Sequence, residues 1–337
     1  MYSLHCQVRR IGLAFLLMKI VVLGAGALGC ALGSVLIDGG NEVWLVNRDK
    51  AHIDAINQLG LRVQENGGDR FVKTFAVTTC SDVDLASGPI DLVIVLVKSF
   101  HTREAIESAK AILGKDTLVL SLQNGLGHED ILSKIVGTSR LLAGKTYAGG
   151  VIIGPGHIIA GTKRKETYIG ELNGQISKRV SLIAKVFNDA GLLTHVSENI
   201  TGTIWDKLLV NIATGALSGI TRLTYGELYQ LPEVEACAIA AVAEAMAVAK
   251  SHGITLSVVD PKQPWVKAAA GLPYEFKASM LQSLEKGSVT EVDFVNGAVV
   301  RWGAQRGIPT PVNQALVACI KGIERDLFHV QMNKVIA

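Results

Sequence analysis

The chain has 337 residues, of which 49% are hydrophobic and 19% are charged. A single domain usually has roughly 150 residues, so this length and composition predict two domains with well-filled cores and exclude a disordered protein. The formal net charge of +3, from 33 basic and 30 acidic residues, is too balanced to indicate binding to nucleic acid or to a membrane surface.

The N-terminal residues resemble a short signal peptide, because the basic pair Arg9-Arg10 precedes an apolar stretch that ends at Met18. However, Lys19 interrupts the apolar run, and cleavage near Ala25 would destroy the glycine motif that follows. We therefore expect the natural start at Met18. An N-terminal extension without defined structure, residues 1–17, is favoured over a targeting segment.

A glycine motif at residues 24–29, Gly-Ala-Gly-Ala-Leu-Gly, carries the strongest functional signal. An apolar strand, residues 20–23, leads into it, an apolar helix follows, and a second strand, residues 42–46, comes next. This order is the context of a dinucleotide-binding turn, in which glycines let the backbone approach a pyrophosphate at a helix N-terminus. The predicted cofactor contacts are Gly24, Ala25, Gly26, Ala27, Leu28 and Gly29.

The segment after the second strand indicates which dinucleotide binds. An NAD-dependent enzyme usually has an acidic residue there to bind the ribose 2′-hydroxyl, but this chain has Arg48, followed by Asp49 and Lys50. A guanidinium suits a 2′-phosphate and Lys50 adds positive charge, whereas Asp49 leaves the local charge ambiguous and Arg48 is alternatively a solvated turn residue. We predict NADP (NADPH) as the cofactor.

Apolar strands and helical segments alternate as far as residue 196. Strands are expected at residues 91–97, 117–122, 141–153, 166–171 and 192–196, with helices at 101–113 and 176–190. This alternation predicts an α/β Rossmann-type domain, residues 18–197, with a doubly wound, mostly parallel sheet.

Strand-like segments end near residues 197–199, and long helical segments follow. Helices are expected at residues 234–252, 289–305 and 311–328. We therefore predict an all-α C-terminal domain, residues 198–337. The ligand cleft is expected between the two domains, at the carboxyl ends of the strands.

Two polar motifs interrupt the apolar helices of this second domain. Lys207 and Asn211 are four residues apart and share one helix face, where they form either a polar site or a solvated lysine beside a capping amide. Ser288 and Glu291 fit the S-x-x-E capping box, so this motif by itself favours Glu291 as a helix cap.

In combination and in order, these motifs resemble the ketopantoate reductase family (2-dehydropantoate 2-reductases). The similarity extends from Met18 to about Phe328. It rests on residues 24–29, Arg48, 97–98, 124–127, 205–207, Asn211, 279–282, 290–293 and 296–297, and on a glycine-containing hairpin at 154–170. The resemblance implies a C-terminal domain like that of 6-phosphogluconate dehydrogenase. It outweighs the solvated and capping interpretations of Lys207 and Glu291.

The resemblance implies NADPH-dependent reduction of 2-dehydropantoate (ketopantoate) to (R)-pantoate, a step in pantothenate and coenzyme A biosynthesis. Lys207 would be the general acid that protonates the alkoxide, and Glu291 would contact Lys207 or the cofactor ribose. The implied cofactor contacts are Lys98, Asn124, Ala148 and Glu291, and the implied substrate contacts are Asn124, Lys207, Asn211 and Ser279.

Three positions depart from that family's pattern: Gly215, Tyr225 and Phe276 stand where family members often have asparagine. The loss of three amides removes hydrogen-bonding groups that would select a substrate hydroxyl, and Phe276 makes the pocket more apolar. A reductase of another branched or aromatic 2-oxo acid is therefore the alternative. An alternative of another class is a non-catalytic, NADP-binding, redox-responsive module.

Cysteine and histidine usage bears on compartment and metals. Five scattered cysteines without a C-x-x-C pair predict reduced thiols in a cytoplasmic protein, and the spacing of the eight histidines predicts no metal site. The expected partner is a small 2-oxo acid, with no nucleic acid and no membrane. A helical domain of this length is also compatible with a homodimer.

Overall fold

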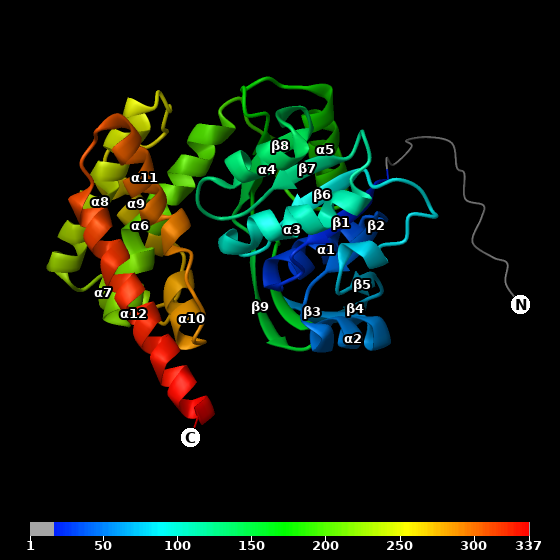
Figure 1. Cartoon of the computed structure of the whole chain (residues 1–337), viewed down its shortest axis with the longest axis horizontal. Coiled ribbons are helices and arrows are strands. Elements are labelled where there is room, and N and C mark those ends of the chain that lie inside the picture. The colour runs from blue at the N-terminus through cyan, green and yellow to red at the C-terminus, as the bar shows by residue number, and fades with distance from the viewer. Residues whose placement is uncertain (1–16, 337) are drawn as a thin grey trace, which may run out of the picture.

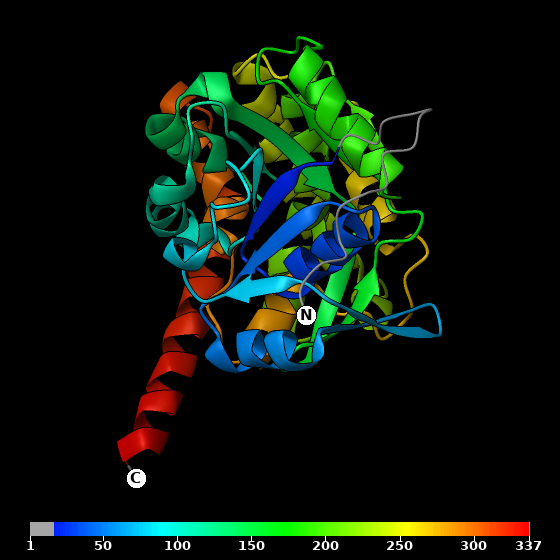
Figure 2. The same cartoon turned by 90° about the vertical axis from the view of Figure 1, so that its right-hand side faces the viewer.

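The computed structural model describes residues 17–336, so the predicted N-terminal extension lies outside the described residues except for Leu17. An α/β unit and a helical unit lie side by side, and the last helix extends beyond the helical unit (Figures 1 and 2). Within the described residues the last strand ends at Val196, and only helices follow. None of the described helices is long and apolar enough to cross a membrane.

The larger sheet has eight strands, which meet in the order β12-β11-β8-β7-β6-β1-β2-β5. They are β1 (Lys19–Leu23), β2 (Glu42–Val46), β5 (Phe75–Val77), β6 (Leu92–Val95), β7 (Leu118–Ser121), β8 (Leu141–Thr146), β11 (Thr167–Gly170) and β12 (Thr194–Val196). Neighbours pair in parallel except β8 and β11, which are antiparallel. The prediction of a mostly parallel, doubly wound sheet is confirmed.

The central strands β1 and β6 are apolar except for Lys19 at the start of β1, because helices cover both faces of this sheet. Along β1, Ile20 and Val22 pack into one buried cluster, while Val21 and Leu23 pack into another. The first cluster includes side chains of α1 (Ala27–Asp38), α2 (Lys50–Leu59) and α5 (Lys178–Asp189). The second includes side chains of α3 (Thr102–Ser108) and α4 (His128–Val136).

Two segments of this unit differ from the prediction. The helix expected at 101–113 is broken into the 3-10 helix η2 (Ser99–His101), α3, and the 3-10 helix η3 (Ala109–Ile112). The strand expected at 141–153 ends at Thr146, whose hydroxyl accepts the Ala148 N–H at 3.0 Å. This local hydrogen bond replaces a ladder bond, and the chain resumes as β9 (Gly149–Gly154) in another sheet.

That second sheet, with the order β4-β3-β10-β9, was not predicted. Its other strands are β3 (Leu61–Glu65), β4 (Gly68–Val72) and β10 (His157–Gly161). Asn66 and Gly67 join β3 to β4 with positive φ angles of 50° and 78°. An Asn-Gly pair is a strong local signal for a hairpin, so the sequence does contain evidence for this sheet. β9 and β10 both pack against α1.

The helical unit is built around α6 (Ile200–Thr221), which packs against five other helices and also against β8 and β11. Trp205, in the first half of this helix, is fully buried. The other helices are α7 (Tyr225–Leu228), α8 (Pro232–Ser251), α9 (Lys262–Ala269), α10 (Ser279–Glu285), α11 (Asn296–Arg306) and α12 (Pro311–Ile336). The remaining 3-10 helices are η1 (Cys80–Asp82), η4 (Thr138–Arg140) and η5 (Val292–Phe294).

The helix expected at 289–305 begins only at Asn296. Val295, directly before it, has a non-helical ψ of −95°. Upstream, the main-chain N–H and the hydroxyl of Thr290 both donate to Glu324 of α12 at 2.7 Å. Residues 292–294 form only the short 3-10 helix η5, so the prediction of one continuous helix from residue 289 is wrong.

Candidate active site

The glycine motif forms the turn between β1 and α1. Gly24 has a φ of +105°, and a Cβ atom there would lie 2.5 Å from the main-chain nitrogen of Val97. A Cβ at Gly29 would overlap the Gly24 carbonyl oxygen, whereas one at Gly26 would meet no described atom within 4 Å. The turn therefore requires glycine on its packed side and exposes its main chain on the other. With no described side chain capping α1, this cradle fits the phosphates of a dinucleotide.

Ala148, an expected cofactor contact, lies in the short link between β8 and β9. The chain then passes directly beside the glycine turn, because a Cβ at Gly150 would lie 3.0 Å from the carbonyl oxygen of Ala27. The link thus borders the turn on the side of the second sheet.

Arg48 lies just after β2 and is exposed. Its guanidinium donates to both carboxylate oxygens of Glu104 at 3.1 Å, and His101 lies 3.4 Å from the same carboxylate. This acidic partner was not predicted. A carboxylate in this position competes with a phosphate for the guanidinium.

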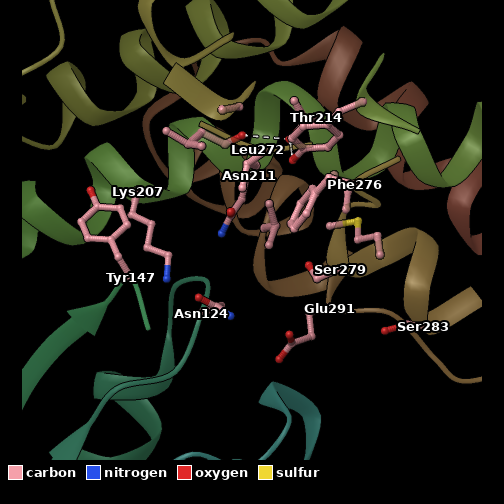
Figure 3. A pocket seen from close by; sticks show the side chains of 17 residues that line it. Asn124, Tyr147, Lys207, Asn211, Thr214, Leu272, Phe276, Ser279, Ser283 and Glu291 are labelled. Carbon is pink, nitrogen blue, oxygen red and sulfur yellow. Dashed lines mark hydrogen bonds between the residues drawn. The ribbon is translucent and has the colours of Figure 1, made fainter. Parts of the chain in front are cut away.

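A pocket of about 290 Å³ lies between the α/β unit and the helical unit. Five residues expected to be catalytic or substrate-binding line it together, although they come from four separate segments (Figure 3). They are Asn124, Lys207, Asn211, Ser279 and Glu291. Lys98 is not part of the lining, but its ammonium lies 3.4 Å from the carboxylate of Glu291, which is. The glycine turn, Arg48 and Ala148 lie outside the lining.

Lys207 and Asn211 extend from α6 into the pocket, one helical turn apart (Figure 3). The start of α6 is fixed by Asn199, whose side chain accepts the Gly202 N–H at 3.1 Å. Because α6 also packs against β8, the side chains of Lys207 and Asn211 lie near the edge of the large sheet although they belong to the helical unit.

The Lys207 ammonium donates a hydrogen bond to the carbonyl oxygen of Thr146, at the end of β8. Burial and, secondly, the positive charge of Lys145 lower the pKa of Lys207 to about 8, while Glu291 acts in the opposite direction. Both lysines face one aromatic ring: the Nζ atoms of Lys145 and Lys207 lie 4.8 and 5.7 Å from the ring centre of Tyr147. A lysine with such a pKa can exchange a proton near neutral pH.

Glu291 does not cap a helix, so the capping interpretation of the S-x-x-E motif is wrong. Its carboxylate crosses to the α/β unit, where it accepts the main-chain N–H and the hydroxyl of Ser99 at 3.0 and 2.6 Å. The ammonium of Lys98 lies 3.4 Å from its other oxygen. The charge of Glu291 is therefore held at the junction of the two units, at one wall of the pocket.

Asn124 follows β7 in a loop that is docked on the helical unit. Gly125 has a φ of +93°, and a Cβ there would lie 2.5 Å from the carbonyl oxygen of Phe294. The same oxygen accepts the Leu126 N–H at 2.9 Å, and the ring of His128 stacks on Phe294 with 5.1 Å between centres. These contacts bring the Asn124 loop next to the segment that carries Glu291.

The wall opposite the sheet contains the three positions that depart from the family pattern. Tyr225 and Phe276 meet edge to face, with 5.0 Å between ring centres. The hydroxyls of Tyr225 and Thr214 bond to each other at 2.8 Å, and a Cβ at Gly215 would touch Met280 at 3.4 Å. Because those hydroxyls are already paired, this wall presents mainly apolar surface to a ligand.

Sequence reasoning missed several lining residues that a simple periodicity would have indicated. Thr214 lies seven residues after Lys207 on α6, and Ser283 lies four residues after Ser279 on α10, so each shares a helix face with a predicted residue. Tyr147 directly follows β8 at the carboxyl edge of the sheet. Lys145 carried no such signal, because it occupies a buried strand position.

The sheet carries a glycine turn of the dinucleotide-binding type, and the helical unit places a lysine and a carboxylate at the carboxyl edge of that sheet. This combination defines a pyridine-nucleotide-dependent oxidoreductase. Among the described residues, no group of three or more histidine, cysteine, aspartate or glutamate side chains could hold a metal ion.

The comparisons with known proteins agree with this class. The family model of ketopantoate reductase PanE/ApbA matches residues 20–174, and the model of its C-terminal domain matches residues 199–324. The 2-dehydropantoate 2-reductases of Pyrococcus horikoshii and Archaeoglobus fulgidus are 33% and 32% identical to this chain. They cover 91% and 92% of it, and 98% and 99% of their own lengths are matched. The chain belongs to the ketopantoate reductase family, whose members are oxidoreductases that act on CH–OH groups.

Solved structures of similar proteins show the same fold. A PanE/ApbA family ketopantoate reductase from Ralstonia eutropha has a TM-score of 0.83 at 35% identity, covering 93% of this chain and 100% of that one. A D-mandelate dehydrogenase, in a ternary structure with NADH and anilino(oxo)acetate, has a TM-score of 0.85 at 30% identity. That match covers 92% of this chain and 99% of the other. The same fold therefore occurs in a protein named for the 2-oxo acid ketopantoate and in one named for the 2-hydroxy acid mandelate.

Proposed function

We propose that this protein reduces 2-dehydropantoate to (R)-pantoate with NADPH, as a step of pantothenate and coenzyme A biosynthesis, with Lys207 as the proton donor. In this proposal residues 18–197 bind the cofactor and residues 198–337 supply the catalytic groups. The observation that carries the proposal is the convergence of Lys207, Asn211, Ser279 and Glu291 on one pocket with Asn124. The names of the relatives supply the substrate.

NADPH, when bound, supplies the hydride. The main chain of the glycine turn at 24–29 would hold its pyrophosphate, Arg48 its 2′-phosphate, and Lys98 and Asn124 its nicotinamide half. Ala148 would contact the cofactor through its main chain. The fit rests on the open face of the turn at Gly26 and the uncapped start of α1.

Lys207 then acts on the carbonyl oxygen of the 2-oxo acid. Its ammonium stabilises the negative charge that develops on this oxygen and donates a proton to it. With a pKa of about 8, Lys207 is mostly protonated at neutral pH, and Glu291 favours this charged form. Asn211 and Ser279 would hydrogen-bond the carboxylate or hydroxyl groups of the substrate, which fixes the carbonyl next to the ammonium.

A second substrate class is favoured by the apolar wall. Tyr225 and Phe276 face the pocket, and the Tyr225 hydroxyl is already paired with Thr214. Such a wall suits a branched or aromatic 2-oxo acid, and a relative of the same fold is named for an aromatic 2-hydroxy acid. The common step is still hydride transfer to C2 with a proton from Lys207.

Steady-state assays with ketopantoate, 2-oxoisovalerate and phenylpyruvate test these proposals, each with NADPH and with NADH. The highest kcat/KM for ketopantoate with NADPH is expected. A kcat/KM for phenylpyruvate well above that for ketopantoate would overturn the substrate. A clear preference for NADH would overturn the role of Arg48, and absence of turnover with every 2-oxo acid would favour a non-catalytic NADP-binding module.

A further inference from the structure

Ser99 lies at the junction of the two units and is fully buried. Its main-chain N–H and its hydroxyl both donate to the same carboxylate oxygen, Oε1 of Glu291, at 3.0 and 2.6 Å. The other oxygen, Oε2, lies 3.4 Å from the Nζ of Lys98. One oxygen of Glu291 is therefore held by two fixed donors, and the other is left for cations.

The Ser99 hydroxyl has a single proton, and the surrounding bonds indicate where it goes. Its other partners are the carbonyl oxygen of Asn124, at 3.2 Å, and Nε2 of His128, at 3.4 Å. The Asn124 oxygen lies 2.8 Å from the same Nε2. A carbonyl oxygen only accepts, so His128 carries its proton on Nε2, and this nitrogen cannot accept from Ser99. Of the two remaining acceptors, Glu291 is the closer and the charged one, so it receives the serine proton.

The main chain of Ser99 is also fixed. Its carbonyl oxygen accepts the hydroxyl of Thr102 at 2.8 Å. The Thr102 oxygen in turn accepts from Nε2 of Gln123, also at 2.8 Å. Ser99, Thr102 and Gln123 are all buried, so water does not compete with these bonds. Both donors to Glu291 are thereby held rigidly.

The main-chain carbonyl of Glu291 accepts the N–H groups of Phe294 and Val295 in its own segment. The donors to its carboxylate, Ser99 and Lys98, both belong to the α/β unit. We propose that Ser99 is a positioning residue that holds the Glu291 carboxylate in its working orientation toward the pocket. Ser99 acts through Glu291 and does not itself contact the reacting atoms. The proposal rests on the role of Glu291 given under the proposed function.

The test is a double-mutant cycle of Ser99→Ala and Glu291→Gln in the full-length enzyme, measured with NADPH and ketopantoate. Ser99→Ala is expected to lower kcat about tenfold, which is typical of one hydrogen bond to a charged group, and to leave the KM for NADPH roughly unchanged. In the Glu291→Gln background the same change is expected to have little further effect, because the charged acceptor is gone.

Two variants separate positioning from general loss of packing. Ser218→Ala removes another fully buried serine hydroxyl, which donates to the Leu223 carbonyl oxygen, and is expected to keep the wild-type kcat. Ser99→Thr keeps the hydroxyl and is expected to recover most of the kcat lost in Ser99→Ala. The thermal unfolding temperature of each variant is measured to check that every kcat compared is that of folded enzyme.

The outcomes distinguish a wrong role for Ser99 from a wrong role for Glu291. If Glu291→Gln lowers kcat but Ser99→Ala does not, the proposal for Ser99 is wrong while the role of Glu291 stands. Equal losses from Ser99→Ala in both backgrounds also overturn it, because its effect then does not pass through Glu291. A Glu291→Gln enzyme with wild-type kcat would instead refute the proposed role of Glu291 itself.

Discussion

Replacement of Lys145 by glutamine should move the alkaline fall of activity to higher pH. Lys145 is buried on β8, and it faces the Tyr147 ring together with Lys207. Its charge lowers the pKa of Lys207, and that of Glu291 raises it. The ammonium of Lys267 also lies 5.8 Å from the centre of the same ring. Three lysines therefore lie within 6 Å of one ring centre, and removing the charge of Lys145 favours protonation of Lys207.

The expected size follows from the geometry. Because the two Nζ atoms lie 4.8 and 5.7 Å from one ring centre, they are at most about 10 Å apart. Two unit charges at that separation repel by about 1.7 kcal/mol at an effective dielectric constant of about 20, so the expected shift is at least about one pKa unit. A general acid works in its protonated form, so activity is complete below its pKa and is lost as the pH rises through it. For wild-type Lys207, with a pKa of about 8 instead of 10.5, this loss is centred near pH 8. Without the charge of Lys145 it should occur at least about one unit higher.

The measurement is kcat/KM for the 2-oxo acid at saturating NADPH, from neutral to alkaline pH. Glutamine keeps a donor for the Tyr147 hydroxyl, which accepts from Lys145 at 3.0 Å in the wild type. Lys267→Gln is the matched control, because Lys267 is exposed and solvent screens its charge, so only a small shift is expected. An alkaline limb that stays in place or moves to lower pH in Lys145→Gln would refute the reasoning.

Four further predictions concern single substitutions in the pocket or at the proposed cofactor contact of Arg48. Lys207→Ala should lower kcat for reduction by about 10²–10⁴, the usual contribution of a positioned proton donor, and an unchanged kcat would exclude it as the acid. Arg48→Ala should raise the KM for NADPH far more than that for NADH. Glu104→Gln should lower the KM for NADPH because it frees the guanidinium from its 3.1 Å carboxylate partner; equal effects on both cofactors would contradict a 2′-phosphate contact. Phe276→Asn should raise kcat/KM for ketopantoate relative to phenylpyruvate, and a change in the opposite direction would show that the apolar wall does not select the substrate.

The parts that sequence analysis predicted correctly are those encoded by local pattern. The glycine turn is specified within residues 24–29, where Gly24 needs a positive φ and Gly29 has no room for a Cβ. Likewise, the apolar runs of β1 and β6 follow from burial on both faces of one sheet. β9 was missed because it follows β8 after a link of only two residues, with no proline between the two strands. The break coincides with the bond from the Ala148 N–H to the Thr146 hydroxyl and with the pair Gly149-Gly150.

Glu291 illustrates why a local motif can predict the wrong partner. Ser288 and Glu291 have the spacing of a capping box, which would form if residues 289–305 were one helix. Thr290 is instead bonded to Glu324, thirty-four residues further along the chain, so the helix starts later and the carboxylate is free to turn outward. Its actual donors, on Ser99, are 192 residues away. No window of the sequence contains that pair.

The chemistry of this site depends on the contact between the two units. Lys207 belongs to the helical unit, but it donates a hydrogen bond to Thr146 of the α/β unit, and the charge of Lys145 in that unit lowers its pKa. Glu291 also arises in the helical unit but is held by Ser99. Lys207, the proposed proton donor, and Glu291, which favours its charged form, are therefore both oriented by atoms of the α/β unit. We propose that this same unit binds the cofactor. A substitution that loosens this junction should therefore reduce kcat even where the pocket wall and the glycine turn are unchanged.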